Sequence, residues 1–278
     1  MVVDNGSTDA TPVLLQARLH CSTLPLVVVT EPTAGISRAR NAGLRHARGR
    51  IICFTDDDCY PAPDFLTAWH DVFQDMRVGY AGGRVELFDP DDADVTTMTD
   101  RTQRLLPSLS LIFPGTVHGC CMAFRREVIK AIGGFDTRLG GGTSLKAAED
   151  SEYVQRASAR GFTGIYSPAP TVWHHDGRKA ADVPTLTDGY ERGEGAFYAC
   201  LLFRGSVVLK AVLREVGALG LAKASIGPCT TIFVGRRRSG GSGTSPGASW
   251  GIFWCRGSPC EKLGDHNTSG TAWSGASG

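Results

Sequence analysis

Three consecutive aspartates, Asp56, Asp57 and Asp58, directly follow an apolar run at residues 51–54. Carboxylates this close repel one another unless a cation or hydrogen-bond donors neutralise them. Asp56 and Asp58 are one residue apart, so both could turn toward one divalent ion and a diphosphate. Hard oxygen ligands of this kind suit Mg²⁺ or Mn²⁺. The alternative interpretation is a solvated acidic turn.

Asp4 follows a second apolar strand end, at Val2 and Val3. In an open α/β sheet, ligands bind outside the carboxyl ends of the strands, so we expect Asp4 on the same edge as Asp56. The segment at residues 35–41 contains Arg38 and Arg40, cationic donors suited to a base or a phosphate.

Two further acidic residues, Glu149 and Asp150, begin a predicted helix just after the glycine-rich loop at residues 140–143. Carboxylates in the first turn of a helix are also favourable for its dipole alone, so this position has a purely structural alternative. His174 ends a predicted strand, and its alternative is a hydrogen-bonded surface histidine.

The elements that must position these residues alternate along the chain. Apolar runs of 4–8 residues predict buried strands, and amphipathic stretches predict helices. Strands are expected at residues 26–29, 51–54, 117–124 and 163–172. Helices are expected at residues 11–20, 35–49, 63–74, 125–132, 147–160 and 190–223. This alternation predicts an α/β fold with a mainly parallel sheet and helices on both faces.

The composition changes twice along the chain, so we expect three parts: a catalytic domain at residues 1–180, a helical segment at 181–234, and a Gly/Ser-rich tail at 235–278. The helical segment is amphipathic, and it either packs on the domain or lies on an anionic membrane surface. The tail has no helical or strand periodicity, which predicts a disordered and dispensable segment.

The overall composition excludes several classes of protein. The 29 Lys and Arg residues nearly balance the 28 Asp and Glu residues, so no electrostatic pattern indicates a nucleic-acid partner. Nine cysteines, with no Cys-x-x-Cys pair, argue against a disulfide scaffold. With neither a signal peptide nor a long apolar run in view, we expect a cytoplasmic protein, peripheral at the inner face of the plasma membrane if the helical segment lies on lipid.

In this order the segments resemble the family 2 glycosyltransferases, which have the GT-A nucleotide-diphospho-sugar fold. Each segment is a weak signal alone, and the resemblance depends on their order and spacing over residues 1–176. The matching segments are VVDNGSTD at 2–9, GISRARN at 35–41, DDD at 56–58, GCCMAFRR at 119–126, IGGFD at 132–136 and EDSE at 149–152, followed by His174.

The resemblance implies a role for each polar residue. Asp4 is expected to bind the nucleotide base, with Arg40 or Arg38 nearby, and Asp56 and Asp57 belong to the donor-binding set. Asp58 is expected to ligate Mn²⁺ or Mg²⁺ at the diphosphate, with Asp56 and His174 as further ligands. Asp150 is expected to be the general base, and Glu149 positions it or the acceptor.

The reaction that the resemblance implies is transfer of a sugar, with inversion, from a UDP-, GDP- or dTDP-sugar to a hydroxyl of a glycan or a lipid-linked acceptor. Bacterial cell-wall polysaccharide synthesis is one setting for such a reaction. Family members begin with a further strand and helix before the segment matching Val2 and Val3, so we expect this chain to lack them.

Two other functions stay open at this stage. One is a catalytically inactive protein of the same fold that only binds the nucleotide sugar. The other is a phosphatase of the haloacid dehalogenase type, which also places Asp-x-Asp after an apolar strand. In that class a small Gly-Thr or Val pair normally follows the motif, whereas Cys59 and Tyr60 follow it here.

Overall fold

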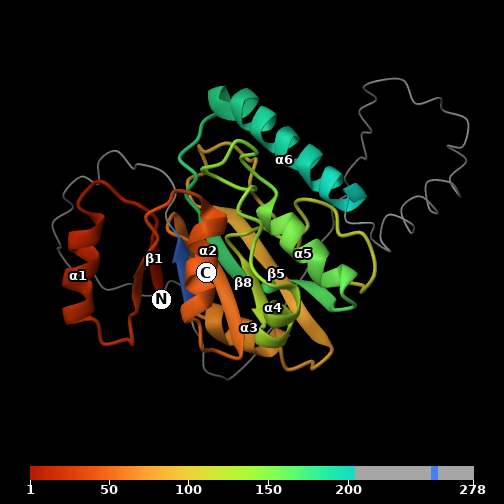
Figure 1. The fold of residues 1–278 in the computed structure, drawn as a ribbon, viewed down its shortest axis with the longest axis horizontal. Coiled ribbons are helices and arrows are strands. Elements are labelled where there is room, and N and C mark those ends of the chain that lie inside the picture. The colour runs from red at the N-terminus through yellow and green to blue at the C-terminus, as the bar shows by residue number, and fades with distance from the viewer. Residues whose placement is uncertain (204–251, 256–278) are drawn as a thin grey trace, which may run out of the picture.

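The computed structural model describes residues 1–203 and 252–255 of the chain. Its strands form one mixed, nine-stranded sheet with helices on both faces (Figure 1). The strands are β1 Val2–Asp4, β2 Val28–Thr30, β3 Ile51–Asp56, β4 Cys59–Pro61, β5 Val78–Leu87, β6 Arg104–Leu106, β7 Met122–Arg125, β8 Thr163–His174 and β9 Ile252–Cys255. The helices are α1 Thr11–Cys21, α2 Ile36–His46, α3 Phe65–Val72, α4 Arg126–Ile132, α5 Glu149–Ala159 and α6 Val183–Phe203, with a 3₁₀ turn at Ala180–Asp182.

The strand order is β2-β1-β9-β3-β7-β5-β8-β4, with β6 paired to β8. Strand β7 runs antiparallel to both β3 and β5, and β5 runs parallel to β8. Consequently β1, β3 and β8 all point the same way, although β4, β6 and β7 run against them. The predicted α/β class is confirmed, and the sheet is mixed where the sequence predicted a mainly parallel one.

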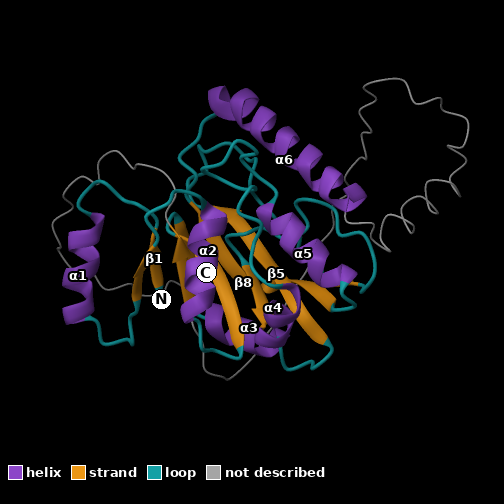
Figure 2. Ribbon diagram, viewed as in Figure 1, coloured by secondary structure: helices purple, strands orange, loops and turns teal. Residues whose placement is uncertain are grey.

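Alternating side chains of the central strands build two cores. Phe54 and Phe124 point to one face, where they pack with Tyr153 of α5. Cys53 and its neighbours point to the other face, where they pack with Trp69 of α3. Figure 2 shows α2 and α5 in front of the sheet. Helix α3 packs on the other face through Trp69, so helices cover both faces as predicted.

Strand β5 was not predicted from the sequence, because glycines interrupt its apolar pattern. The glycines are there because the neighbouring strands lie too close for a side chain. A Cβ atom on Gly83 would lie 2.4 Å from the Cys121 Sγ atom and 2.5 Å from the Pro170 carbonyl oxygen. The same residues that weaken the strand signal therefore permit close packing at the centre of the sheet.

The segments after residue 180 are described only in part. Helix α6 begins at Val183, and the predicted helical stretch beyond Phe203 lies outside the described residues. Phe197 is fully buried, and a Cβ atom on Gly193 would lie 2.7 Å from that of Ala147, so this part of α6 packs on the domain. In the expected tail, strand β9 is described, and the rest lies outside the described residues.

No helix among residues 1–203 and 252–255 is both long enough and apolar enough to cross a membrane.

Candidate functional site

The site residues predicted from the sequence gather at one edge of the sheet. Asp4 ends β1, Asp56 ends β3 and His174 ends β8. Because these three strands point the same way, their carboxyl ends share this edge. The expectation that Asp4 and Asp56 lie on a common rim is therefore consistent with the strand directions.

At the β1 end, the backbone is held by the side chain of Asn5. Its Nδ2 atom donates to the carbonyl oxygens of Glu31 and Thr33, at 2.9 and 2.8 Å, and its Oδ1 atom accepts from the Gly35 N–H at 2.8 Å. Asp4 is buried, and its carboxylate accepts from the Ser7 N–H at 3.1 Å. These bonds fix the start of α2 beside Asp4.

The Arg40 guanidinium joins two parts of the site that are far apart in the sequence. It lies in α2, is 1% exposed, and donates to the Glu149 Oε1 atom at 2.7 Å and to the Asp56 Oδ1 atom at 3.3 Å. It also lies over the Phe135 ring, 5.6 Å from its centre. Arg40 therefore bridges the end of β3 and the start of α5.

The motif at residues 132–136 holds α2 in this place. The Asn41 side chain donates to the Phe135 carbonyl oxygen at 2.9 Å and accepts from the Phe135 N–H at 2.7 Å. A Cβ atom on Gly134 would lie 2.6 Å from the Asn41 Oδ1 atom, so a side chain there would disturb this pair of bonds. Gly134 thus permits the contact between Asn41 and Phe135. Because Asn41 directly follows Arg40 in the chain, this contact also orients Arg40.

Asp150 lies next to this bridge at the start of α5 and is only partly buried. Its Oδ2 atom accepts from the Gly119 N–H at 2.9 Å, and its Oδ1 atom accepts from the N–H and hydroxyl of Ser151 at 2.6 and 3.2 Å. Gly119 also lies against Arg40, because a Cβ atom there would be 2.5 Å from the guanidinium. These donors hold the carboxylate in a fixed orientation.

Burial changes the proton affinity of the two carboxylates that Arg40 contacts. Burial raises the pKa of Glu149 to about 7, helped by the neighbouring Asp150 charge and opposed by Arg40. Burial also raises the pKa of Asp56, and here too Arg40 opposes the shift. Arg40 thus favours the ionised forms of both Glu149 and Asp56.

Asp58 and His174 make a second contact on the same edge. The Asp58 Oδ2 atom is 3.4 Å from the His174 Nε2 atom, and the His174 Nδ1 atom is 3.0 Å from the Thr96 hydroxyl. Burial lowers the pKa of His174, but the hydrogen bond with Asp58 and the neighbouring negative charges together outweigh burial, and the pKa rises to about 9. Burial raises the pKa of Asp58, but the hydrogen bond and charge of His174, together with the smaller contributions of the Asp58 backbone and the Cys59 thiol, outweigh burial and lower this pKa.

These residues fit a divalent cation. The ligand atoms of Asp58, Cys59 and His174 lie within 4.8 Å of one another. A carboxylate with an imidazole is a donor set that suits Mn²⁺, and the Thr96 hydroxyl orients the ring as a second layer of contacts does in metal sites. The Cys59 thiol has a strongly raised pKa, because of its hydrogen bond with Cys120 and its burial, so it is a poor ligand.

Other predicted residues lie at the same edge with different surroundings. Arg38 and Asp57 are exposed, as a group that contacts a soluble ligand must be. Arg40 is the exception to the predicted roles, because its guanidinium is buried between Asp56 and Glu149 instead of facing a base. Asp56 bonds to Arg40 and is outside the cluster of possible metal ligands formed by Asp58, Cys59 and His174.

Sequence reasoning missed Gly119 and Thr96. Gly119 was within a matching segment, but its contact with Arg40 spans 79 positions and left no local signal. Thr96 lies in an irregular stretch between β5 and β6, where no periodicity indicated a site.

Residues 1–133 match the sequence model of glycosyl transferase family 2. The chain is also similar to glycosyltransferase AglE of Haloferax volcanii, with 24% identity over 80% of this chain and 68% of that protein. A second relative, the probable glycosyltransferase YdaM of Bacillus subtilis, is 25% identical over 63% of this chain, which spans 43% of YdaM.

Two solved structures are among those to which this chain is similar. Mannosyltransferase PcManGT from Pyrobaculum calidifontis, in complex with GDP-Man and Mn²⁺, has a TM-score of 0.46 and 23% identity over 80% of this chain and 71% of its own. S. aureus TarS 1-349, in complex with UDP-GlcNAc, has a TM-score of 0.49 and 19% identity over 63% of this chain and 49% of its own.

Proposed function

We propose that this chain is a family 2 glycosyltransferase, because its first 133 residues match the model of that family, and that it transfers a sugar from a nucleotide-diphospho-sugar to an acceptor hydroxyl, with inversion. In this reaction the acceptor oxygen attacks the anomeric carbon from the side opposite the leaving nucleoside diphosphate. One C–O bond forms, the bond to the diphosphate breaks, and the acceptor proton goes to a base on the protein.

Asp150 is that base. Its carboxylate already accepts three hydrogen bonds, from Gly119 and Ser151, which orient it and leave acceptor capacity for a fourth donor. It lies in the first turn of α5, at the positive end of the helix dipole. A fixed, ionised and partly exposed carboxylate is suited to take the proton of an acceptor hydroxyl.

Arg40 and Glu149 position this base. Their 2.7 Å bond ties the start of α5 to α2, and the Arg40 bond to Asp56 continues the link to the donor side. Glu149 therefore acts through Arg40, and contact with the acceptor is left to Asp150. This bridge between Asp56 and the helix of Asp150 is the observation that carries the proposal.

The donor binds along the rim from Asp4 to Asp58, with Arg38, Asp56 and Asp57 beside it. Asp58 and His174 would hold Mn²⁺ or Mg²⁺ there, and the cation would act as a Lewis acid that stabilises the leaving diphosphate. The donor is a UDP-, GDP- or dTDP-sugar, and the acceptor is a glycan or a lipid-linked glycan.

Release of nucleoside diphosphate from a panel of these donors tests the proposal. The protein is incubated with each donor, with Mn²⁺, Mg²⁺ or a chelator, because slow transfer to water reports donor use without a known acceptor. We expect release from one donor class that requires the cation. Tight binding without release would favour an inactive binding protein, and phosphate release from a phosphomonoester would favour the phosphatase.

A further inference from the structure

A basic hollow lies at the opposite end of β3 from the candidate site. Its volume is about 390 Å³, and four cationic side chains line it against a single carboxylate, Glu127. Ile51, the first residue of β3, lines the hollow, whereas Asp56 ends the strand at the candidate site. At the usual rise of a strand the two ends are about 17 Å apart, so the hollow is separate from the donor site.

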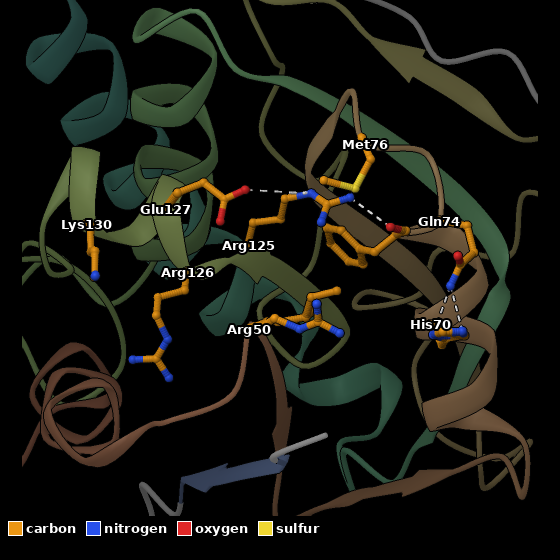
Figure 3. Close-up of a pocket in the computed structure, with 10 residues that line it drawn as sticks. Arg50, His70, Gln74, Met76, Arg125, Arg126, Glu127 and Lys130 are labelled. Carbon is orange, nitrogen blue, oxygen red and sulfur yellow. Dashed lines mark hydrogen bonds and ion pairs between the residues drawn. The ribbon is translucent and has the colours of Figure 1, made fainter. Parts of the chain in front are cut away.

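One of the four cations is already used by the fold. The Arg125 guanidinium donates to the carbonyl oxygens of Phe73 and Val78 at 2.7 Å each, and to that of Asp75 at 3.0 Å. It also lies 4.0 Å from the Glu127 carboxylate (Figure 3). Arg125 therefore stabilises the wall of the hollow. Its guanidinium, which already donates to three carbonyl oxygens, is the cation that Glu127 faces.

The other three cations, Arg50, Arg126 and Lys130, have no carboxylate partner among residues 1–203 and 252–255. Arg50 and Lys130 are exposed at the hollow (Figure 3). Arg126 donates through its Nε atom to the Gly49 carbonyl oxygen at 2.7 Å. Its Nη2 atom is buried and has no hydrogen-bond partner in the described part of the chain.

A buried guanidinium nitrogen without an acceptor is costly and uncommon, so it calls for an acceptor from outside the chain. Beside it, Arg50 and Lys130 give an uncompensated positive field in a protein whose formal net charge is only +1. A phosphate group offers several acceptor oxygens and a negative charge, which is the chemistry that Arg and Lys bind together.

We propose that this hollow is a phosphate-binding site, with Arg126 as the inner donor and Arg50 and Lys130 at its mouth. Its ligand is the phosphate of a lipid headgroup or of a soluble phosphate compound. Met76, which is 76% exposed and also lines the hollow, gives its rim an apolar side chain that the acyl region of a lipid surface would cover.

The test compares the full chain with the double variant Arg50→Ala/Lys130→Ala, which removes two exposed side chains and no hydrogen bond described here. Arg18→Ala is the control, because Arg18 is an exposed arginine on α1 and does not line the hollow. Calorimetry measures the binding of inorganic phosphate. Cosedimentation measures binding to phosphatidylcholine vesicles with and without phosphatidylglycerol.

The double variant should lose phosphate or anionic-vesicle binding by about tenfold or more, since charge-assisted bonds are lost. Arg18→Ala should bind as the unmodified chain does. Loss of vesicle binding, with or without phosphate binding, identifies a lipid headgroup, and loss of phosphate binding alone identifies a soluble ligand. The proposal is overturned if the unmodified chain binds neither probe, or if the double variant binds both as tightly.

Discussion

At the scale of single residues, Arg40 has the most demanding surroundings in the described site. A buried cation keeps its charge only when opposite charges and hydrogen bonds replace water, and here Glu149 and Asp56 do so. Removing one member leaves the others buried and uncompensated. The three residues are therefore best understood as one unit that both stabilises the fold and orients the site.

Replacing Arg40 with Met should lower the free energy of unfolding by about 3–5 kcal/mol, the usual cost of breaking a buried ion pair. Chemical denaturation measures this loss. Arg45→Met is the control, because Arg45 is 63% exposed and its pair with Glu31 is 3.5 Å long, so its loss should be at most about 1 kcal/mol. Equal effects of the two substitutions would show that Arg40 does not hold the site together.

Glu149 should make stability depend on pH. Its pKa in the folded protein is about 7, above its ordinary 4.5, so the folded state binds more protons than the unfolded state between these values. The free energy of unfolding should therefore fall as pH rises from 4.5 to 7.

Thermal melts of the protein and of Glu149→Gln across that interval check this expectation. The Gln variant cannot titrate, so its melting temperature should fall less over the same interval. A variant with the same slope as the unmodified protein would assign the pH dependence to other groups.

The sequence located the candidate carboxylates but not the role of Arg40. Asp56 and Asp150 stand out locally, because one follows an apolar run and the other begins a helix. Arg40 looked like one of two cations that could meet a ligand. Its actual partner Glu149 is 109 positions away, and only the folded structure brings the two residues together.

At the scale of elements, the backbone at Gly119 connects the two halves of the candidate site. It donates to Asp150 on one side and lies against the Arg40 guanidinium on the other. Only a residue without a side chain allows both contacts. The loop before β7 is thus part of the site, although it contributes no functional side chain there.

Gly119→Ala should displace Arg40, cost about 1–3 kcal/mol of stability as an overpacking substitution, and reduce turnover. Gly141→Ala is a matched control, because a Cβ atom there would meet nothing within 4 Å and its loop adjoins the same site. Denaturation curves and donor-turnover assays of both variants make the comparison. If Gly119→Ala were as stable and as active as Gly141→Ala, the close contact with Arg40 would not matter.

The elements themselves were predictable where periodicity was clear. Helices α1, α4 and α5 begin within a few residues of the expected positions. Strand β5 was missed because its glycines serve packing between strands, and β4 was missed because its three residues form a strand only by pairing with β8. Both depend on neighbours that are distant in sequence.

At the scale of the whole molecule, β9 has an unexpected place in the sheet. It pairs in parallel with β1 on one side and with β3 on the other. It therefore joins β1, which carries Asp4, to β3, which carries Asp56. Composition predicted a dispensable segment from residue 235 onward. The pairing of β9 predicts instead that its four residues contribute to stability.

Two shortened chains distinguish these expectations. A chain ending at residue 256 keeps β9, whereas one ending at residue 251 removes it and leaves backbone groups of β1 and β3 without partners. The shorter chain should melt at a lower temperature and bind the donor more weakly than the longer one. Identical melting and binding would support the prediction from composition.

We propose that Asp150 removes the acceptor proton while other residues hold the donor. The most direct measurement is turnover and donor affinity of Asp150→Asn, with Asp188→Asn, an exposed residue of α6, as the control. Turnover of Asp150→Asn should fall by about 10²–10⁴, the usual contribution of a general base. Donor affinity should stay nearly unchanged, and Asp188→Asn should behave as the unmodified protein. Near-normal turnover of Asp150→Asn would contradict the assignment, and so would a parallel loss of donor binding.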